Sequence, residues 1–221
     1  MTGDVLQISM FTVVAALTAT ALMLVPGVAL AWLLARRAFP GKSIVETLVA
    51  LPLVMPPVAT GLLLLWLFAR RGPLGALLDR LGIDIVFTPR AVVIAMSVMG
   101  LPLLVRTARA GFEQVTRRYE QMAETLGASP MRVFTTVTLP LAGRNILAGA
   151  TLAFSRALGE FGATIVVAGS IPGQTRTLAV GIFTSTESGQ EAMAAVLLVI
   201  SVAIAFVAVL VSNRLVTART A

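Results

Sequence analysis

The segment Gln121–Pro140, QMAETLGASPMRVFTTVTLP, is a polar interruption between two long apolar stretches. Of the 221 residues, 57% are hydrophobic and only 12% are charged, whereas charged residues make up roughly a quarter of a soluble globular domain. The mean hydropathy is +0.94. These values predict an all-α integral membrane protein, with residues 1–221 forming a single membrane domain and the polar segment lying in water.

Five apolar stretches are candidate membrane-spanning helices, because about 20 residues at 1.5 Å each cross a hydrocarbon core of about 30 Å. The third reaches that length only if it extends to Ala110 and two arginines, Arg106 and Arg109, snorkel to the interface. The first is too long for a cleavable signal peptide and lacks its basic start, so we expect it to be retained. The sequence predicts a bundle of five transmembrane helices, with six as the alternative: Val5–Ala35, Thr47–Ala69, Ala91–Val105, Leu141–Ala168 and Ala192–Asn213.

The basic residues indicate how this bundle is oriented. With five spans, eleven Lys and Arg residues fall in one set of loops and five in the other. The positive-inside rule then predicts an outside N-terminus, with the C-terminus and the polar segment in the cytoplasm. The net charge of +7 is spread between apolar runs, which favours membrane orientation over nucleic-acid binding. The larger set is Arg36, Arg37, Lys42, Arg106, Arg109, Arg117, Arg118, Arg132, Arg144, Arg214 and Arg219, and the smaller is Arg70, Arg71, Arg80, Arg90 and Arg176.

The polar segment and the residues just before it predict two short helices joined by a glycine turn. From Glu113 to Leu126 the apolar residues recur at steps of three and four, which predicts an amphipathic helix with one narrow buried stripe. Gly127 stands where a helix ends in a left-handed residue, and Ser129 suits the N-cap of a second helix, Pro130–Val137, that stops before Pro140. Such a hairpin either lies on the lipid surface or docks on a partner protein. The stripe consists of Val115, Tyr119, Met122, Ala123 and Leu126.

Two apolar stretches contain features that a plain membrane helix does not need. Pro56 and Pro57 break the predicted helix 47–69, either as a packing kink or as the opening of a pathway that Thr60 and Gly61 line. In the stretch 141–168, Arg156 and Glu160 are spaced to pair on one helix, either as a structural ion pair or as a gate. Gly159 and Gly162 allow a close helix approach or a hinge beside them.

Other residues have simpler interpretations. Arg106 and Arg109 flank Thr107 near the predicted cytoplasmic mouth and could contact an anion, although orientation alone explains them. Trp32 and Trp66 are expected to anchor the membrane interface. The chain contains no Cys and no His, which leaves few groups for a membrane enzyme. A passive anion channel is a further alternative, but it would not need the cytoplasmic hairpin.

The spacing of the hairpin resembles the EAA loop of permease subunits of ABC importers. That pattern runs E-A-A, three residues, G, nine residues, I-x-L-P, and here it reads Q-M-A, three residues, G, nine residues, V-T-L-P. Gln121 and Met122 depart from the pattern, although Glu120 and Glu124 lie next to them. The resemblance implies that the region of about 113–140 docks on an ATPase through Gln121, Ala123, Glu124, Gly127, Ala128, Ser129, Arg132, Val137, Leu139 and Pro140.

Further stretches resemble the molybdate-transporter permeases within that family. They read LGEFGATI from Leu158, GSIPGQTRT from Gly169, FPGK from Phe39 and LPLVMPPVATG from Leu51, so the matches run from about residue 32 to residue 183. Sulfate and thiosulfate permeases share parts of them. The resemblance implies the type I ABC importer permease fold and transport of molybdate, with tungstate as a related oxyanion. The residues that we expect at a pathway or gate are Pro56, Pro57, Thr60, Gly61, Arg156, Gly159, Glu160 and Gly162.

The resemblance also implies partners that this chain does not contain. No G-x-x-x-x-G-K-[ST] phosphate-binding loop occurs in the sequence, so ATP and Mg²⁺ are expected on two separate ATPase subunits. A second copy of the chain and an extracytoplasmic molybdate-binding protein complete the expected complex. Within this chain we expect membrane lipid as a partner, but no cofactor, metal or nucleic acid.

Overall fold

The computed structural model describes the backbone of residues 2–217 and the side chains of residues 3–211, and the described chain is entirely helical. Arg219, which contributed to the predicted orientation, lies outside the described residues. The elements are α1 (Thr2–Arg36), α2 (Lys42–Val54), α3 (Pro57–Phe68), α4 (Gly75–Asp79), α5 (Pro89–Gln114), α6 (Arg117–Thr125), α7 (Pro130–Val133), the π-helix η1 (Phe134–Thr138), α8 (Leu139–Leu158), α9 (Gly162–Ala168), α10 (Leu178–Glu187) and α11 (Glu191–Thr217).

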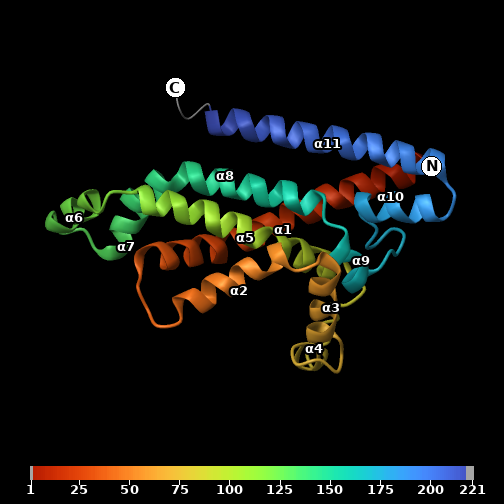
Figure 1. Ribbon diagram of the computed structural model, residues 1–221, viewed down its shortest axis with the longest axis horizontal. Coiled ribbons are helices and arrows are strands. Elements are labelled where there is room, and N and C mark those ends of the chain that lie inside the picture. Colours follow the sequence, from red (N-terminus) through yellow and green to blue (C-terminus); the bar gives the residue numbers. More distant parts are fainter. Residues whose placement is uncertain (1, 218–221) are drawn as a thin grey trace.

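The core forms where α5 packs between α1 and α8, and Figure 1 shows these helices running along the long axis of the molecule. Small residues allow the close approach, since a Cβ added at Gly100 would lie 3.1 Å from the carbonyl oxygen of Ala153. Fully buried alanines from the three helices line the same contact: Ala16 and Ala19 of α1, Ala91 and Ala95 of α5, and Ala153 and Ala157 of α8.

Among the described residues, four helical stretches are long and apolar enough to span a membrane: α1, α5, Pro130–Leu158 and α11. The pair α2 and α3 provides a fifth if the two helices count as one bent span. The prediction of five spans agrees with this count. Helix α5 begins at Pro89 and continues to Gln114, as the proposed extension past Val105 required.

The predicted break in the second span is confirmed. The helical path bends by 117° between α2 and α3, and Met55 and Pro56 lie at the bend. Pro57 lies in the first turn of α3, where a backbone N–H would have no partner within the helix. The missing N–H of proline therefore costs no hydrogen bond there. In Figure 1, α3 therefore leaves the direction of the bundle and α4 lies beyond it.

The prediction of one helix over Leu141–Ala168 is wrong. Helix α8 ends at Leu158, and a separate short helix, α9, begins at Gly162. The carboxylate of Glu160 accepts a hydrogen bond of 2.7 Å from the N–H of Ala163, which stabilises the start of α9. Arg156 and Glu160 therefore do not lie on one helix. Helix α10 was not predicted, because its ten residues are too few to cross a membrane.

The second predicted helix of the polar segment does not stop before Pro140. Residues Phe134–Thr138 form a π-helix that joins α7 to α8, so the helical backbone continues through the proline. Pro140 has no N–H to donate, and the wider π turn lets the N–H of Leu139 bond to the carbonyl of Phe134 instead. The predicted helix 113–126 is also shorter, because α5 continues to Gln114 and α6 begins at Arg117.

Candidate functional site

The segment that joins α5 to α8 forms a hairpin of α6 and α7 at one end of the bundle (Figure 1). Gly127 has φ +83°, as its position predicted, and a Cβ there would meet nothing within 4 Å. The N–H of Gly127 bonds to Glu124 and that of Ala128 to Ala123, which is the hydrogen-bond pattern of a Schellman cap. Ser129 occupies the N-cap position of α7, but its side chain makes no capping bond.

The apolar stripe of the hairpin faces outward, contrary to the prediction that it would be buried. Tyr119 and Met122 are each 55% exposed, and Leu126 is 88% exposed. On α7, Met131 is 71% exposed. Only Val115, which precedes α6, belongs to the core. These exposed apolar side chains form a surface at the end of the bundle that no other described residue covers, which is typical of an interaction site.

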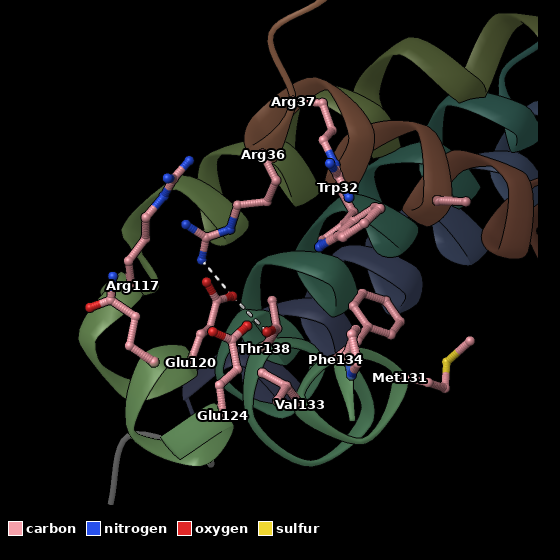
Figure 2. A pocket seen from close by; sticks show the side chains of 13 residues that line it. Trp32, Arg36, Arg37, Arg117, Glu120, Glu124, Met131, Val133, Phe134 and Thr138 are labelled. Atoms are coloured by element: carbon pink, nitrogen blue, oxygen red, sulfur yellow. Dashed lines mark hydrogen bonds and ion pairs between the residues drawn. The ribbon is translucent and has the colours of Figure 1, made fainter. Parts of the chain in front are cut away.

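A partly buried ion pair connects the hairpin to the bundle. Arg36, the last residue of α1, places Nη2 2.9 Å from Glu120 Oε1 and donates a second bond of 2.9 Å to the carbonyl of Val115. Thr138 of η1 donates to the same Glu120 oxygen at 2.7 Å. Figure 2 shows these side chains converging from three elements. Glu120 therefore connects α6 to both α1 and the start of α8.

A pocket of about 580 Å³ opens beside this ion pair, between the end of α1 and the hairpin (Figure 2). Trp32 and Phe134 form an apolar wall, with ring centroids 5.6 Å apart in an edge-to-face arrangement. Trp32 is thus a packing residue as well as a candidate interface anchor, whereas Trp66 is 70% exposed. The charged and polar lining consists of Arg36, Arg37, Arg117, Glu120, Gln121, Glu124 and Thr138.

The ten residues that the EAA resemblance singled out differ in accessibility. Val137 and Leu139 are partly buried, and Leu139 packs against the core that contains Phe112. Ala123 and Ala128 are also partly buried. The role of Glu120 as a contact residue was not predictable from the local pattern, because its partner Arg36 lies 84 positions earlier. The exposed members of the set are Gln121, Glu124, Gly127, Ser129, Arg132 and Pro140.

A second cluster forms where α3 packs against α9. A Cβ added at Gly61 would lie 2.8 Å from both Cα and the carbonyl oxygen of Ala163, and one at Gly162 would lie 2.7 Å from Cβ of Pro57. Both glycines are therefore required by the close approach of two backbones. The structure brings together these predicted pathway residues, which lie about 100 positions apart in the sequence. Gly159 makes no such contact, because its nearest neighbour is a carbonyl at 4.0 Å.

Buried polar groups surround this helix contact. Arg156 Nη1 lies 2.8 Å from Glu160 Oε2, and the Glu160 side chain is only 1% exposed. The hydroxyls of Thr60 and Thr164 are buried and have no hydrogen-bond partner among the described residues. A buried hydroxyl without a partner is unfavourable by about 1–3 kcal/mol. Both hydroxyls lie where α3 and α9 pack against each other.

The arginines near the hairpin end differ in their contacts. Arg109 Nη1 lies 2.8 Å from Glu46 Oε1 and its Nε lies 2.7 Å from Glu113 Oε1, so it ties α5 to α2. Arg106 is exposed. Across residues 3–211, no three His, Cys, Asp or Glu side chains come together as a metal site requires.

Comparisons with known proteins agree on one class. The family model for binding-protein-dependent transport system inner membrane components matches residues 27–220. The molybdenum transport system permease protein ModB of Escherichia coli (strain K12) is 47% identical over 191 residues, which cover 86% of this chain and 83% of that protein. The sulfate transport system permease protein CysT of Salmonella typhimurium is 35% identical over 199 residues, covering 88% and 72%.

Solved structures show the same fold. A chain of a bacterial alginate ABC transporter, in complex with alginate pentasaccharide-bound periplasmic protein, superposes with a TM-score of 0.73 at 15% identity, covering 95% of this chain and 77% of that one. A chain of the MetNI methionine ABC transporter, in an inward-facing conformation, gives 0.66 at 15% identity, covering 99% and 95%.

Proposed function

Because the chain belongs to the family of binding-protein-dependent transport system inner membrane components, we propose that it is the permease subunit of an ABC importer that carries molybdate across the cytoplasmic membrane. The relatives support this substrate, because the molybdenum permease of Escherichia coli is 47% identical and the sulfate permease of Salmonella typhimurium is 35% identical. Sulfate is the second candidate. Tungstate, a tetrahedral dianion like molybdate, belongs to the same substrate class.

The exposed stripe on the hairpin is the observation that carries the coupling role. Tyr119, Met122 and Leu126 would not remain in water on the surface of an isolated subunit without cost. We assign this surface to an ATPase subunit, with Gln121, Glu124 and Arg132 as polar contacts around it. ATP and Mg²⁺ belong to two such subunits. A second copy of this chain would place the pathway on a symmetry axis, and an extracytoplasmic binding protein would deliver the anion.

The orientation follows from the charges and the position of the hairpin. We place the hairpin, the end of α1 and the C-terminal end in the cytoplasm and the N-terminal end outside. In Figure 1 the first turn of α1 and the last described turn of α11 lie toward opposite ends of the long axis, which supports an odd number of crossings.

We assign the gate to the contact between α3 and α9. In this proposal the structure is a closed state, in which Gly61 and Gly162 let the two helices exclude water. Opening would separate α3 from α9 and hydrate the hydroxyls of Thr60 and Thr164. The Arg156–Glu160 pair would keep α9 attached to α8 during that movement.

Replacing Gly127 with valine tests the docking role. Gly127→Val adds left-handed strain of about 1–2 kcal/mol and a branched side chain at the turn, so we expect ATP-driven uptake and co-purification of the ATPase to be lost, with normal membrane insertion. Gly82→Val is a matched control, because Gly82 has φ +68°, open space around it and the same pair of turn hydrogen bonds. Unchanged uptake in Gly127→Val, or equal loss in both variants, would contradict the docking role.

A further inference from the structure

The turn of residues 169–177, GSIPGQTRT, is a rigid structure to which the proposed function gives no role. Gly169 and Gly173 have positive φ angles of +68° and +76°. Thr175, which lies after these glycines and before α10, is fully buried. Its hydroxyl accepts a hydrogen bond of 3.0 Å from the N–H of Ile171 and donates one to the carbonyl of Gly169. The N–H of Leu178 donates to the Thr12 hydroxyl at 2.9 Å, which fixes the turn to α1.

This turn holds Arg176 in a defined position. Its Nε donates to the Ser170 hydroxyl at 3.0 Å, and its side-chain stem passes close to Gly181 of α10. Among the described residues no acceptor contacts its two terminal nitrogens. A guanidinium fixed through Nε presents the remaining N–H groups as a planar fork, which matches two oxygens of an anion.

The fork of Arg176 faces a pocket of about 200 Å³ enclosed by the turn, the first turns of α1 and the junction of α10 and α11. Ile8, Met193 and Leu197 form its apolar floor. Ser185 lines the pocket and is only 8% exposed. The side-chain amides of Gln7 and Gln190 also line the pocket and supply further donors, whereas the carboxylate of Asp4, another lining group, can only accept hydrogen bonds.

We propose that this pocket binds a tetrahedral oxyanion of the kind that the importer carries, at the end of the subunit where the anion arrives. Arginine, hydroxyl and amide donors suit such an anion, and the volume admits one with its first waters. The carboxylate of Asp4 also lines the pocket, and its negative charge lowers the affinity for an anion. A low affinity suits a transport subunit, because an anion must also leave each site along its route. The choice of oxyanion rests on the proposed function.

Equilibrium binding of radiolabelled molybdate to the purified permease–ATPase complex, without the binding protein, tests the site. We expect saturable binding that weakens at least about tenfold in Arg176→Gln, the loss expected for hydrogen bonds to a charged group. Arg80→Gln is the matched control, because Arg80 is exposed and belongs to the same predicted set of outer loops. Equal binding by wild type and Arg176→Gln, or no saturable binding by wild type, would overturn the proposal.

A second variant and a second assay distinguish failure of the pocket from failure of the proposed function. Ser185→Ala removes only the buried hydroxyl, and we expect weaker molybdate binding with normal assembly, whereas unchanged binding would contradict the site. The second assay is molybdate uptake into proteoliposomes with the binding protein. If the vesicles take up molybdate but Arg176→Gln does not weaken binding, the proposed pocket is refuted and the proposed function stands. If the complex carries no molybdate at all, the proposed function fails as well.

Discussion

Glu120 is the side chain on which the geometry of the hairpin depends. It contacts Arg36 and Thr138, so a single carboxylate connects α6 with the end of α1 and the start of α8. The side chains of Arg36 and Glu120 are only 11% and 17% exposed, and Arg36 Nε is buried without a partner. Loss of the carboxylate would leave a nearly buried guanidinium with one fewer acceptor.

Glu120→Ala removes this acceptor and should therefore destabilise the subunit by about 1–3 kcal/mol, the range for leaving a buried polar group unsatisfied. Thermal unfolding of the purified subunit in detergent measures this loss. Glu124→Ala is the control, because Glu124 lies on the next turn of the same helix and is exposed. If the two variants unfold at the same temperature, the ion pair does not hold the hairpin.

The helices around the broken span show what the sequence could and could not predict. The break at Pro56 was predictable, because two consecutive prolines, Pro56 and Pro57, remove backbone donors in the middle of the predicted span. The separation of α8 from α9 was not, because α9 is capped by Glu160 and packs on α3 through Gly61, contacts that only the folded chain creates. Periodicity identified the stripe of α6 as apolar, but it could not distinguish the core of this chain from the surface of a complex.

The absence of cysteine from the sequence makes the proposed gate between α3 and α9 directly testable. Single variants Thr60→Cys and Thr164→Cys should resist a membrane-impermeant maleimide in the resting complex, because both side chains are buried. During ATP turnover with loaded binding protein, we expect labelling to rise severalfold. Arg80→Cys, at an exposed position outside the hairpin, should label equally in both conditions. If labelling of Thr60→Cys and Thr164→Cys is the same at rest and during ATP turnover, there is no gate at this junction.

The whole molecule has the architecture that its hydropathy predicted, a helical bundle with a water-exposed hairpin. Hydropathy predicts spans well because a membrane helix must satisfy its own backbone hydrogen bonds, so its signal is local in the sequence. It did not predict α10 or the pocket at Arg176, since these depend on the packing of α1, α10 and α11 against one another.

Orientation is the property of the whole molecule that labelling of intact cells can measure. Ser188 follows α10 and Thr125 ends α6, and both are exposed. Figure 1 shows α10 and α6 toward opposite ends of the bundle, so Ser188→Cys and Thr125→Cys sample both ends. We expect an impermeant maleimide to reach Ser188→Cys from outside and to reach Thr125→Cys only after the membrane is opened. The reverse pattern would invert the orientation, and labelling of both from outside would contradict the span count.

Uptake of radiolabelled molybdate into proteoliposomes tests the central claim most directly. The vesicles would contain this chain with its ATPase subunits, and loaded binding protein would be added outside. We predict uptake that requires internal ATP and that excess sulfate inhibits only weakly. Uptake that proceeds without ATP would indicate a passive channel, and uptake that prefers sulfate would contradict the assignment of molybdate as substrate.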